Sequence, residues 1–266
     1  MKYIPALGIS APELDWVPSP TFALRRQAVL DRVSKWRRGS VLEVGCGSGA
    51  ILYDMALLGF TGVGVETSEP ARQVAESILQ GLPSMAISAC IPGKSEQYDY
   101  LLSFEVLEHI EDDLAALTDW VKHLNPGGIC LISVPAHPSH WNLTDVMAGH
   151  YRRYARREIL GLIASAGLTP HYVATYGWPA TWIIERVRNW VRKRQLAKQG
   201  FKLDAVALGD PERTARSGIE RSIEARLFPY YSGLLGRGLF ASLAGLQRAF
   251  YKSDRGISYL IEARKL

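Results

Sequence analysis

Residues 41–49 constrain the fold of this chain more than any other stretch. They join a short apolar run containing one carboxylate, Glu43, to three glycines at alternate positions, Gly45, Gly47 and Gly49. An apolar β-branched run that ends in Gly-x-Gly-x-Gly predicts a buried parallel strand, a tight turn and the start of a helix. Because glycine lacks a Cβ atom, such a turn lets the backbone approach a ligand closely.

Strands and helices are expected to alternate through most of the chain. The expected strands are 40–44, 61–66, 85–88, 98–103, 129–134, 171–176 and 257–263, and the expected helices are 49–58, 70–80, 112–124 and 157–166. This alternation predicts an α/β fold, a doubly wound, mostly parallel seven-stranded sheet within a single domain over residues 1–266. The proline-rich residues 1–18 are expected to form an extended lead-in to a helix that begins at Pro20 and lies over the glycine turn.

A long segment separates the last two expected strands, far beyond the usual connection length. We expect a helical insertion over residues 180–255, with helices near 180–198, 211–227 and 232–251. The first of these alternates tryptophans and aliphatic residues with arginines. Such an insertion can form a lid over a bulky or lipophilic acceptor, a homodimer face, or a peripheral contact with an anionic membrane.

Composition sets broad limits. The 266 residues, 47% of them hydrophobic, suffice for one sizeable core, and the net charge of +5 mildly favours acidic partners. Three widely separated cysteines, Cys46, Cys90 and Cys130, predict reduced core thiols in a cytoplasmic protein. No signal-peptide pattern and no apolar run of about 18 residues occurs, so we expect neither export nor a membrane span.

Two carboxylates flank the expected ligand site. Ligands of open parallel sheets bind at the carboxyl ends of the strands, where the turn after strand 40–44 lies. Glu66 ends the next strand, 23 residues after Glu43, close to the ~20-residue offset of an acidic residue that binds ribose hydroxyls. Glu43 would be costly to bury unless a positively charged ligand group or several donors met it. A dinucleotide dehydrogenase is the alternative, but its Gly-x-Gly-x-x-Gly loop places the third glycine one residue later.

Four motifs now stand in order: the glycine turn, Glu66, the Phe-Glu-Val-Leu-Glu-His segment 104–109 and the Asn-Pro-Gly-Gly segment 125–128. From about residue 16 to 176, and again in the last strand, the chain resembles Rossmann-like (class I) S-adenosylmethionine-dependent methyltransferases. The resemblance implies S-adenosyl-L-methionine as cofactor. It implies these cofactor-binding residues: Glu43, Gly45, Cys46, Gly47, Gly49, Glu66, Thr67, Ala89, Cys90 and Phe104. One departure is the lack of an Asp after strand 85–88, so Ser88 or the backbone would take its place.

An acidic and histidine cluster follows strand 98–103. If Glu105, Glu108 and His109 begin a helical turn, they share one face and form half of a site for Mg²⁺, Mn²⁺ or Zn²⁺, with His150 as a further ligand. The pattern resembles the metal-binding residues of Hen1-type small-RNA 2′-O-methyltransferases and the related pattern of ubiquinone-biosynthesis O-methyltransferases. A metal would lower the pKa of a substrate hydroxyl. Alternatively, the Glu residues cap backbone amides and His109 is structural, or His109 or His150 acts as a metal-free catalytic base.

The acceptor site is expected on the other rim of the sheet. Its candidate residues are His137, Trp141, Tyr151, Arg152 and Arg153, although the arginines equally fit a solvated helix entry. The predicted function is O-methylation of a hydroxyl on a small, aromatic or lipophilic acceptor. The alternatives are an RNA 2′-O-methyltransferase and a non-enzymatic protein of this fold that binds a membrane or a partner. No RNA-binding module is recognisable, so nucleic acid is disfavoured, and the intact glycines and Glu66 argue against the non-enzyme.

Overall fold

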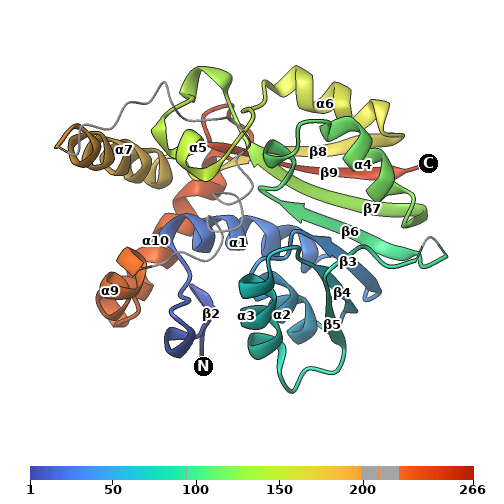
Figure 1. Cartoon of the computed structure of the whole chain (residues 1–266), viewed down its shortest axis with the longest axis horizontal. Helices are drawn as coiled ribbons and strands as arrows, with labels where there is room; N and C mark the ends of the chain where they lie inside the picture. The colour runs from blue at the N-terminus through green and yellow to red at the C-terminus, as the bar shows by residue number, and fades with distance from the viewer. Residues whose placement is uncertain (94, 199–208, 210–221) are drawn as a thin grey trace.

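The computed structural model describes residues 1–93, 95–198, 209 and 222–266, and its centre is a seven-stranded sheet (Figure 1). The sheet order is β5-β4-β3-β6-β7-β9-β8, and β9 runs antiparallel to both of its neighbours. The strands are β3 Ser40–Val44, β4 Thr61–Val65, β5 Met85–Ser88, β6 Tyr98–Phe104, β7 Leu124–Pro135, β8 Leu168–Tyr176 and β9 Ser258–Lys265. The predicted α/β fold with a mostly parallel seven-stranded sheet is confirmed. Strand order reverses beside β3, so a crevice is expected at the carboxyl ends of β3 and β6.

Helices cover both faces of the sheet. They are α1 Pro20–Val33, α2 Ala50–Leu57, α3 Glu69–Leu79, α4 Asp113–Val121, α5 Leu143–Ala148, α6 Arg156–Ser165, α7 Ala180–Lys198, α9 Ser222–Tyr231 and α10 Leu234–Phe250. Successive strand residues point to opposite faces. Leu102 accordingly packs in a core with α1, α2 and α3, whereas Leu101 packs in a second core with α4 and α6.

Three local expectations are wrong. Residues 1–18 contain a hairpin, β1 Lys2–Ile4 and β2 Gly8–Ser10, and are not simply extended. Strand β7 begins at Leu124, so the Asn-Pro-Gly-Gly segment lies inside it, where a register shift against β6 absorbs the extra residues. Cys90 is exposed because it follows β5, the edge strand of the sheet, whereas Cys46 and Cys130 are buried.

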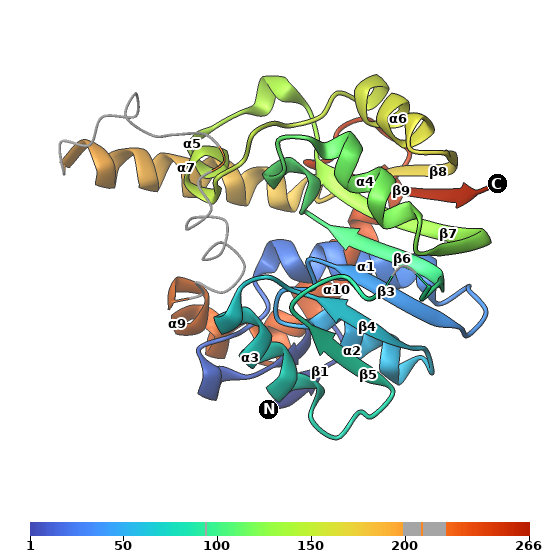
Figure 2. The same ribbon diagram turned by 45° about the vertical axis from the view of Figure 1, so that its right-hand side comes forward.

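The helices α7, α9 and α10 lie between β8 and β9 in the chain. Most of the helix expected over 211–227 falls outside the described residues. The side chain of Gln247 anchors α10, because its Nε2 donates to the carbonyl of Leu24 at 3.0 Å and its Oε1 accepts from the amide of Gly177 at 3.2 Å. Helix α10 is thereby held against α1 and the end of β8. Figure 2 shows α7 and α9 extending to one side of the sheet.

Candidate active site

A cavity of about 860 Å³ opens at the carboxyl ends of the central strands. Nine of the ten expected cofactor residues line it: Glu43, Gly45, Cys46, Gly47, Glu66, Thr67, Ala89, Cys90 and Phe104. The glycine turn and strands β3, β4 and β6 thus supply one wall. Helix α1 supplies another through Phe22 and Arg25, as expected for a helix over the turn.

The glycines of the turn have different roles. Gly47 has φ 54°, and a Cβ atom built there would meet nothing within 4 Å, so a ligand can approach this backbone. Gly49, at φ 70°, lies outside the cavity lining, and a Cβ atom there would lie 3.1 Å from the Cβ of Ala75 on α3. Gly49 therefore allows close packing of α2 on α3.

Glu66 is held in place by two backbone amides. The amide of Gly47 donates to its Oε2 at 2.9 Å, and the amide of Ser68 donates to its Oε1 at 2.8 Å. These bonds fix the carboxylate beside the glycine turn, on the cavity wall. The nearby Ser88 hydroxyl donates to the carbonyl of Cys90 at 2.7 Å, so it shapes the turn after β5.

Glu43 and Arg25 both line the cavity wall beside the glycine turn. Glu43 is 2% exposed, and its Oε2 has no hydrogen-bond partner among the described residues. Burial raises the pKa of Glu43 to about 8, although the positive charge of Arg25 acts in the opposite direction. The Nε of Arg25 is likewise buried without a partner in the described part of the chain. Sequence reasoning did not identify Arg25, because α1 was known only to lie near the turn.

Glu108, His109 and His150 converge on a second part of the cavity, with ligand atoms within 4.8 Å of one another. Both carboxylate oxygens of Glu108 are buried without a hydrogen-bond partner among the described residues. Burial and then the neighbouring charge of Glu105 raise the pKa of Glu108 well above its usual range. Burial, together with His150, lowers the pKa of His109 to about 3, so this imidazole is neutral near pH 7.

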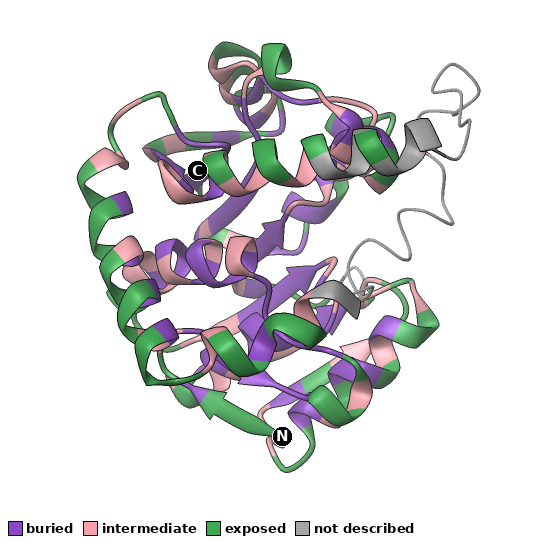
Figure 3. Cartoon of the chain, turned by 90° about the vertical axis from the view of Figure 1, so that its left-hand side faces the viewer, coloured by how far each residue is buried: buried purple, intermediate pink, exposed green. Residues whose placement is uncertain are grey.

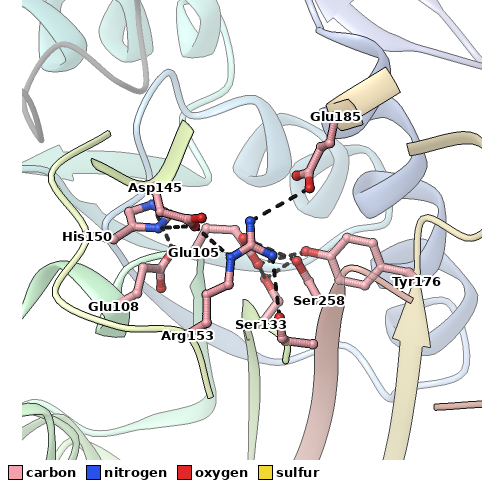
Figure 4. A network of polar contacts seen from close by, with 10 residues as sticks. Glu105, Glu108, Ser133, Asp145, His150, Arg153, Tyr176, Glu185 and Ser258 are labelled. Atoms are coloured by element: carbon pink, nitrogen blue, oxygen red, sulfur yellow. Dashed lines mark hydrogen bonds and ion pairs between the residues drawn. The ribbon is translucent and has the colours of Figure 1, made fainter. Parts of the chain in front are cut away.

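Asp145 organises the histidine at this end of the cavity (Figure 4). Its Oδ1 lies 3.0 Å from Nδ1 of His150 and accepts a hydrogen bond from Nε of Arg153 at 2.8 Å. Burial opposes ionisation, but the hydrogen bond from His150 and the charge of Arg153 hold the pKa of Asp145 below its usual range. With Nδ1 facing a carboxylate, Nε2 of His150 is left toward Glu108, 4.0 Å from Oε1. Asp145 was not identified from the sequence. It lies on α5, and the sequence does not reveal that α5 turns this side chain toward His150 and Arg153.

Glu105 does not join this cluster. Its backbone has φ 59° and its amide still donates to the carbonyl of Ser133, whereas the turn that carries Glu108 begins at Leu107. The expected shared helical face is therefore wrong. Instead, the carboxylate accepts hydrogen bonds from the hydroxyls of Ser133, Tyr176 and Ser258 at 3.0, 2.8 and 3.3 Å. Ser133, Tyr176 and Ser258 belong to β7, β8 and β9, respectively, and Figure 4 shows their side chains near Glu105.

The structure divides the expected acceptor residues. Tyr151 and Arg153 line the cavity, whereas His137, Trp141 and Arg152 lie outside its lining. Arg152 forms an ion pair outside the cavity, since its guanidinium donates to Asp113 at 2.9 Å. Arg153 is buried and already bonded to Asp145. Helix α7 adds two cavity residues that the sequence did not single out, Glu185 and Arg188.

Comparisons with known proteins identify the family. A family model described as a methyltransferase domain matches residues 23–173. The chain belongs to this methyltransferase family. The matched region contains the glycine turn, Glu66 and the His150 cluster, so the resemblance to Rossmann-like S-adenosylmethionine-dependent methyltransferases is confirmed.

This methyltransferase is also similar to individual proteins. The ubiquinone biosynthesis O-methyltransferase of Dinoroseobacter shibae is 31% identical over 148 residues, which cover 49% of this chain and 60% of that relative. The enzyme of the same name from Parvibaculum lavamentivorans is 33% identical over 97 residues, covering 35% of this chain and 38% of the relative. Among solved structures, the [4+2]-cyclase SpnF superposes with a TM-score of 0.54 at 16% identity, covering 98% of this chain and 87% of SpnF. That last likeness concerns the fold alone, and fold alone does not define chemistry.

Proposed function

We propose that this methyltransferase transfers the methyl group of S-adenosylmethionine to a hydroxyl of a small, aromatic or lipophilic acceptor. One observation carries the proposal: a single cavity holds both the glycine turn with Glu66 and the His150–Asp145 pair. The first arrangement suits a nucleoside cofactor and the second suits proton removal from an acceptor. The two relatives that match part of this chain are named O-methyltransferases, which favours oxygen as the methylated atom.

The cofactor would lie along the wall built by β3, β4 and α1. Glu66 would accept hydrogen bonds from the ribose hydroxyls. Glu43 would meet the ammonium group and Arg25 the carboxylate of the methionine end, so that the unused polar atoms of both side chains gain partners. Gly47 leaves the room that such a ligand needs.

The chemistry follows from direct displacement. The acceptor oxygen attacks the methyl carbon, the carbon–sulfur bond breaks, and its electron pair neutralises the sulfonium to give S-adenosylhomocysteine. The hydroxyl proton passes to Nε2 of His150, while Asp145 holds Nδ1 and stabilises the imidazolium. His109, with its pKa lowered to about 3, is the poorer base.

A divalent metal is a second way to activate the hydroxyl. Glu108, His109 and His150 offer one carboxylate and two imidazoles, and the partnerless carboxylate of Glu108 fits a cation. Asp145 would then orient His150 as a ligand through its second ring nitrogen. When bound, such an ion would lower the pKa of the acceptor hydroxyl.

An acceptor screen tests the proposal. The protein would be incubated with S-adenosylmethionine carrying a labelled methyl group and with phenols, catechols, long-chain alcohols or RNA oligonucleotides. We expect a methyl ether of a small hydroxyl compound, identified by mass spectrometry, and no product with the His150→Gln variant. Labelled RNA alone would support the 2′-O-methyltransferase alternative, and an N-methylated product would contradict the oxygen assignment.

A further inference from the structure

The outer face of α10 is mostly apolar. The residues that α10 buries are Gly236, Phe240, Ala244 and Gln247. The exposed positions are 234, 235, 238, 239, 241, 242, 245, 246, 248 and 249, and among these only Arg248 is charged. A helix on a protein surface normally carries its charged residues on this side. The exposed face of α10 therefore lacks the charged residues that are usual for a face in contact with water.

The connection between α9 and α10 forms an apolar tip. Leu227 and Tyr230 at the end of α9 are 52% and 80% exposed, and Leu234 and Leu235 at the start of α10 are 85% and 92% exposed. The tip is firmly supported, because Phe228 and its neighbours pack in a buried cluster beneath it. Rigidly exposed leucines of this kind mark a contact surface.

Helix α7 presents a second apolar stripe. Ile183, Val187 and Trp190 are each more than half exposed and follow one another at helical spacing. The Arg188 side chain joins α7 to α9 by donating to Glu224 at 3.3 Å. Both helices extend to the same side in Figures 1 and 2, and Figure 3 shows the molecule from that side, coloured by burial.

The charge of this part of the chain favours one class of partner. Residues 180–256 contain 15 of the 31 Lys and Arg residues and 7 of the 26 Asp and Glu residues, which gives +8, whereas the remainder of the chain is −3. Positive charge around exposed leucines and aromatic residues matches a bilayer with anionic head groups. Two copies of the chain would oppose like charges across this face, and a nucleic acid would leave the leucines without a partner.

We propose that the outer face of α10, the α9–α10 tip and the α7 stripe together form a docking surface for a bilayer that contains anionic lipids. The leucines and Tyr230 enter the boundary between head groups and acyl chains, and the arginines contact the phosphates. None of the helices described by the structure is long and apolar enough to cross a bilayer, so the contact is interfacial. On its other side, α7 lines the cavity with Glu185 and Arg188. If the proposed function holds, a lipophilic acceptor can thus reach the cavity from the bilayer beside α7.

Vesicle flotation tests this surface without cofactor or acceptor, so its outcome is independent of methyl transfer. The full chain would be mixed with vesicles of phosphatidylcholine alone or with added phosphatidylglycerol, at low and high salt. We expect flotation with the anionic vesicles, weakened by salt, and at least about a tenfold loss of partitioning for the double variant Leu234→Glu, Leu235→Glu. Leu57→Glu is the matched control, since Leu57 is 54% exposed on α2, and it should float like the wild type.

Uncharged variants separate apolar insertion from charge. Leu234→Gln with Leu235→Gln should also lose binding, while circular dichroism melts remain close to those of the wild type because both side chains are exposed. The proposal is overturned if the wild type does not float with anionic vesicles or if the double variants float as well as the wild type. A dimer in sedimentation experiments that the same variants dissociate, without vesicle binding, would overturn it in favour of a second copy of the chain.

Discussion

The Nδ1 atom of His150 lies 3.0 Å from Oδ1 of Asp145, which fixes the ring with Nε2 toward the cavity. Asp145→Asn should therefore lower kcat by about 10²–10⁴-fold, because the imidazolium loses its stabilising carboxylate. The Kd for S-adenosylmethionine should stay within about twofold, since Asp145 lies at the acceptor end. Single-turnover kinetics and calorimetry measure the two quantities. Asp119→Asn, which changes an exposed carboxylate paired with Lys122 outside the cavity lining, is the control, and an unchanged kcat in Asp145→Asn would remove His150 as base.

Arg25 and Arg26 are neighbours with separate expected roles. The guanidinium of Arg26 is fully buried against Asp54, at 2.5 and 2.6 Å, so Arg26→Gln should lower the free energy of unfolding by about 3–5 kcal/mol. Arg25→Gln should leave that free energy nearly unchanged and raise the Kd for S-adenosylmethionine about 10- to 100-fold, the loss of one charge-assisted contact. Denaturant melts and titration calorimetry give both values. Wild-type affinity in Arg25→Gln would contradict the carboxylate assignment.

Glu43 should make stability fall as the pH rises. Its pKa is about 8 in the folded protein against an ordinary 4.5, so the folded state holds an extra proton between these values. The stabilisation is complete below pH 4.5 and is lost as the pH rises toward and through 8, by as much as about 5 kcal/mol. Melts of wild type and Glu43→Gln from pH 5 to about pH 9 measure this slope. We expect the Glu43→Gln variant to show a flatter dependence of stability on pH, and bound cofactor to flatten this dependence in the wild type. Parallel curves for the two proteins would rule out Glu43 as its cause.

Chelation distinguishes the two proposed ways of activating the hydroxyl. If His150 alone is the base, turnover should be unchanged by a strong chelator. If the cluster holds a metal, the chelator should abolish turnover, Mn²⁺ or Zn²⁺ should restore it, and Glu108→Gln should bind the ion at least about tenfold more weakly. Metal content of the purified protein and activity before and after chelation are the readouts.

Much of the fold and of the cofactor wall was predictable from local patterns. Gly47 and Glu66 meet across adjacent parallel strands, so a motif and one strand register suffice to bring them together. Arg25 lies on α1, before the glycine turn, and Asp145 lies on the short helix α5, after β7. Their side chains reach the cavity only through tertiary packing, which a single sequence does not reveal.

Glu105 illustrates a different limit. A helical turn from residue 105 would place it beside Glu108, but β6 ends at Phe104, Glu105 has φ 59°, and the turn that carries Glu108 begins only at Leu107. Instead, its carboxylate accepts hydrogen bonds from the hydroxyls of Tyr176 and Ser258, which belong to later strands. The orientation of this carboxylate is therefore set by hydroxyl groups that are distant in the sequence. The local spacing alone had predicted a metal ligand.

Titration of S-adenosylmethionine into wild type and Glu66→Ala tests the central claim most directly, because Glu66 joins the glycine turn to the proposed ribose site. The account predicts micromolar binding by the wild type and at least about a hundredfold weaker binding by Glu66→Ala, for the loss of a carboxylate that accepts charge-assisted hydrogen bonds. Glu69→Ala, which changes an acidic residue at the start of α3 outside the cavity lining, should bind like the wild type. Equal affinity of Glu66→Ala and wild type, or no binding by a folded wild type, would contradict the account.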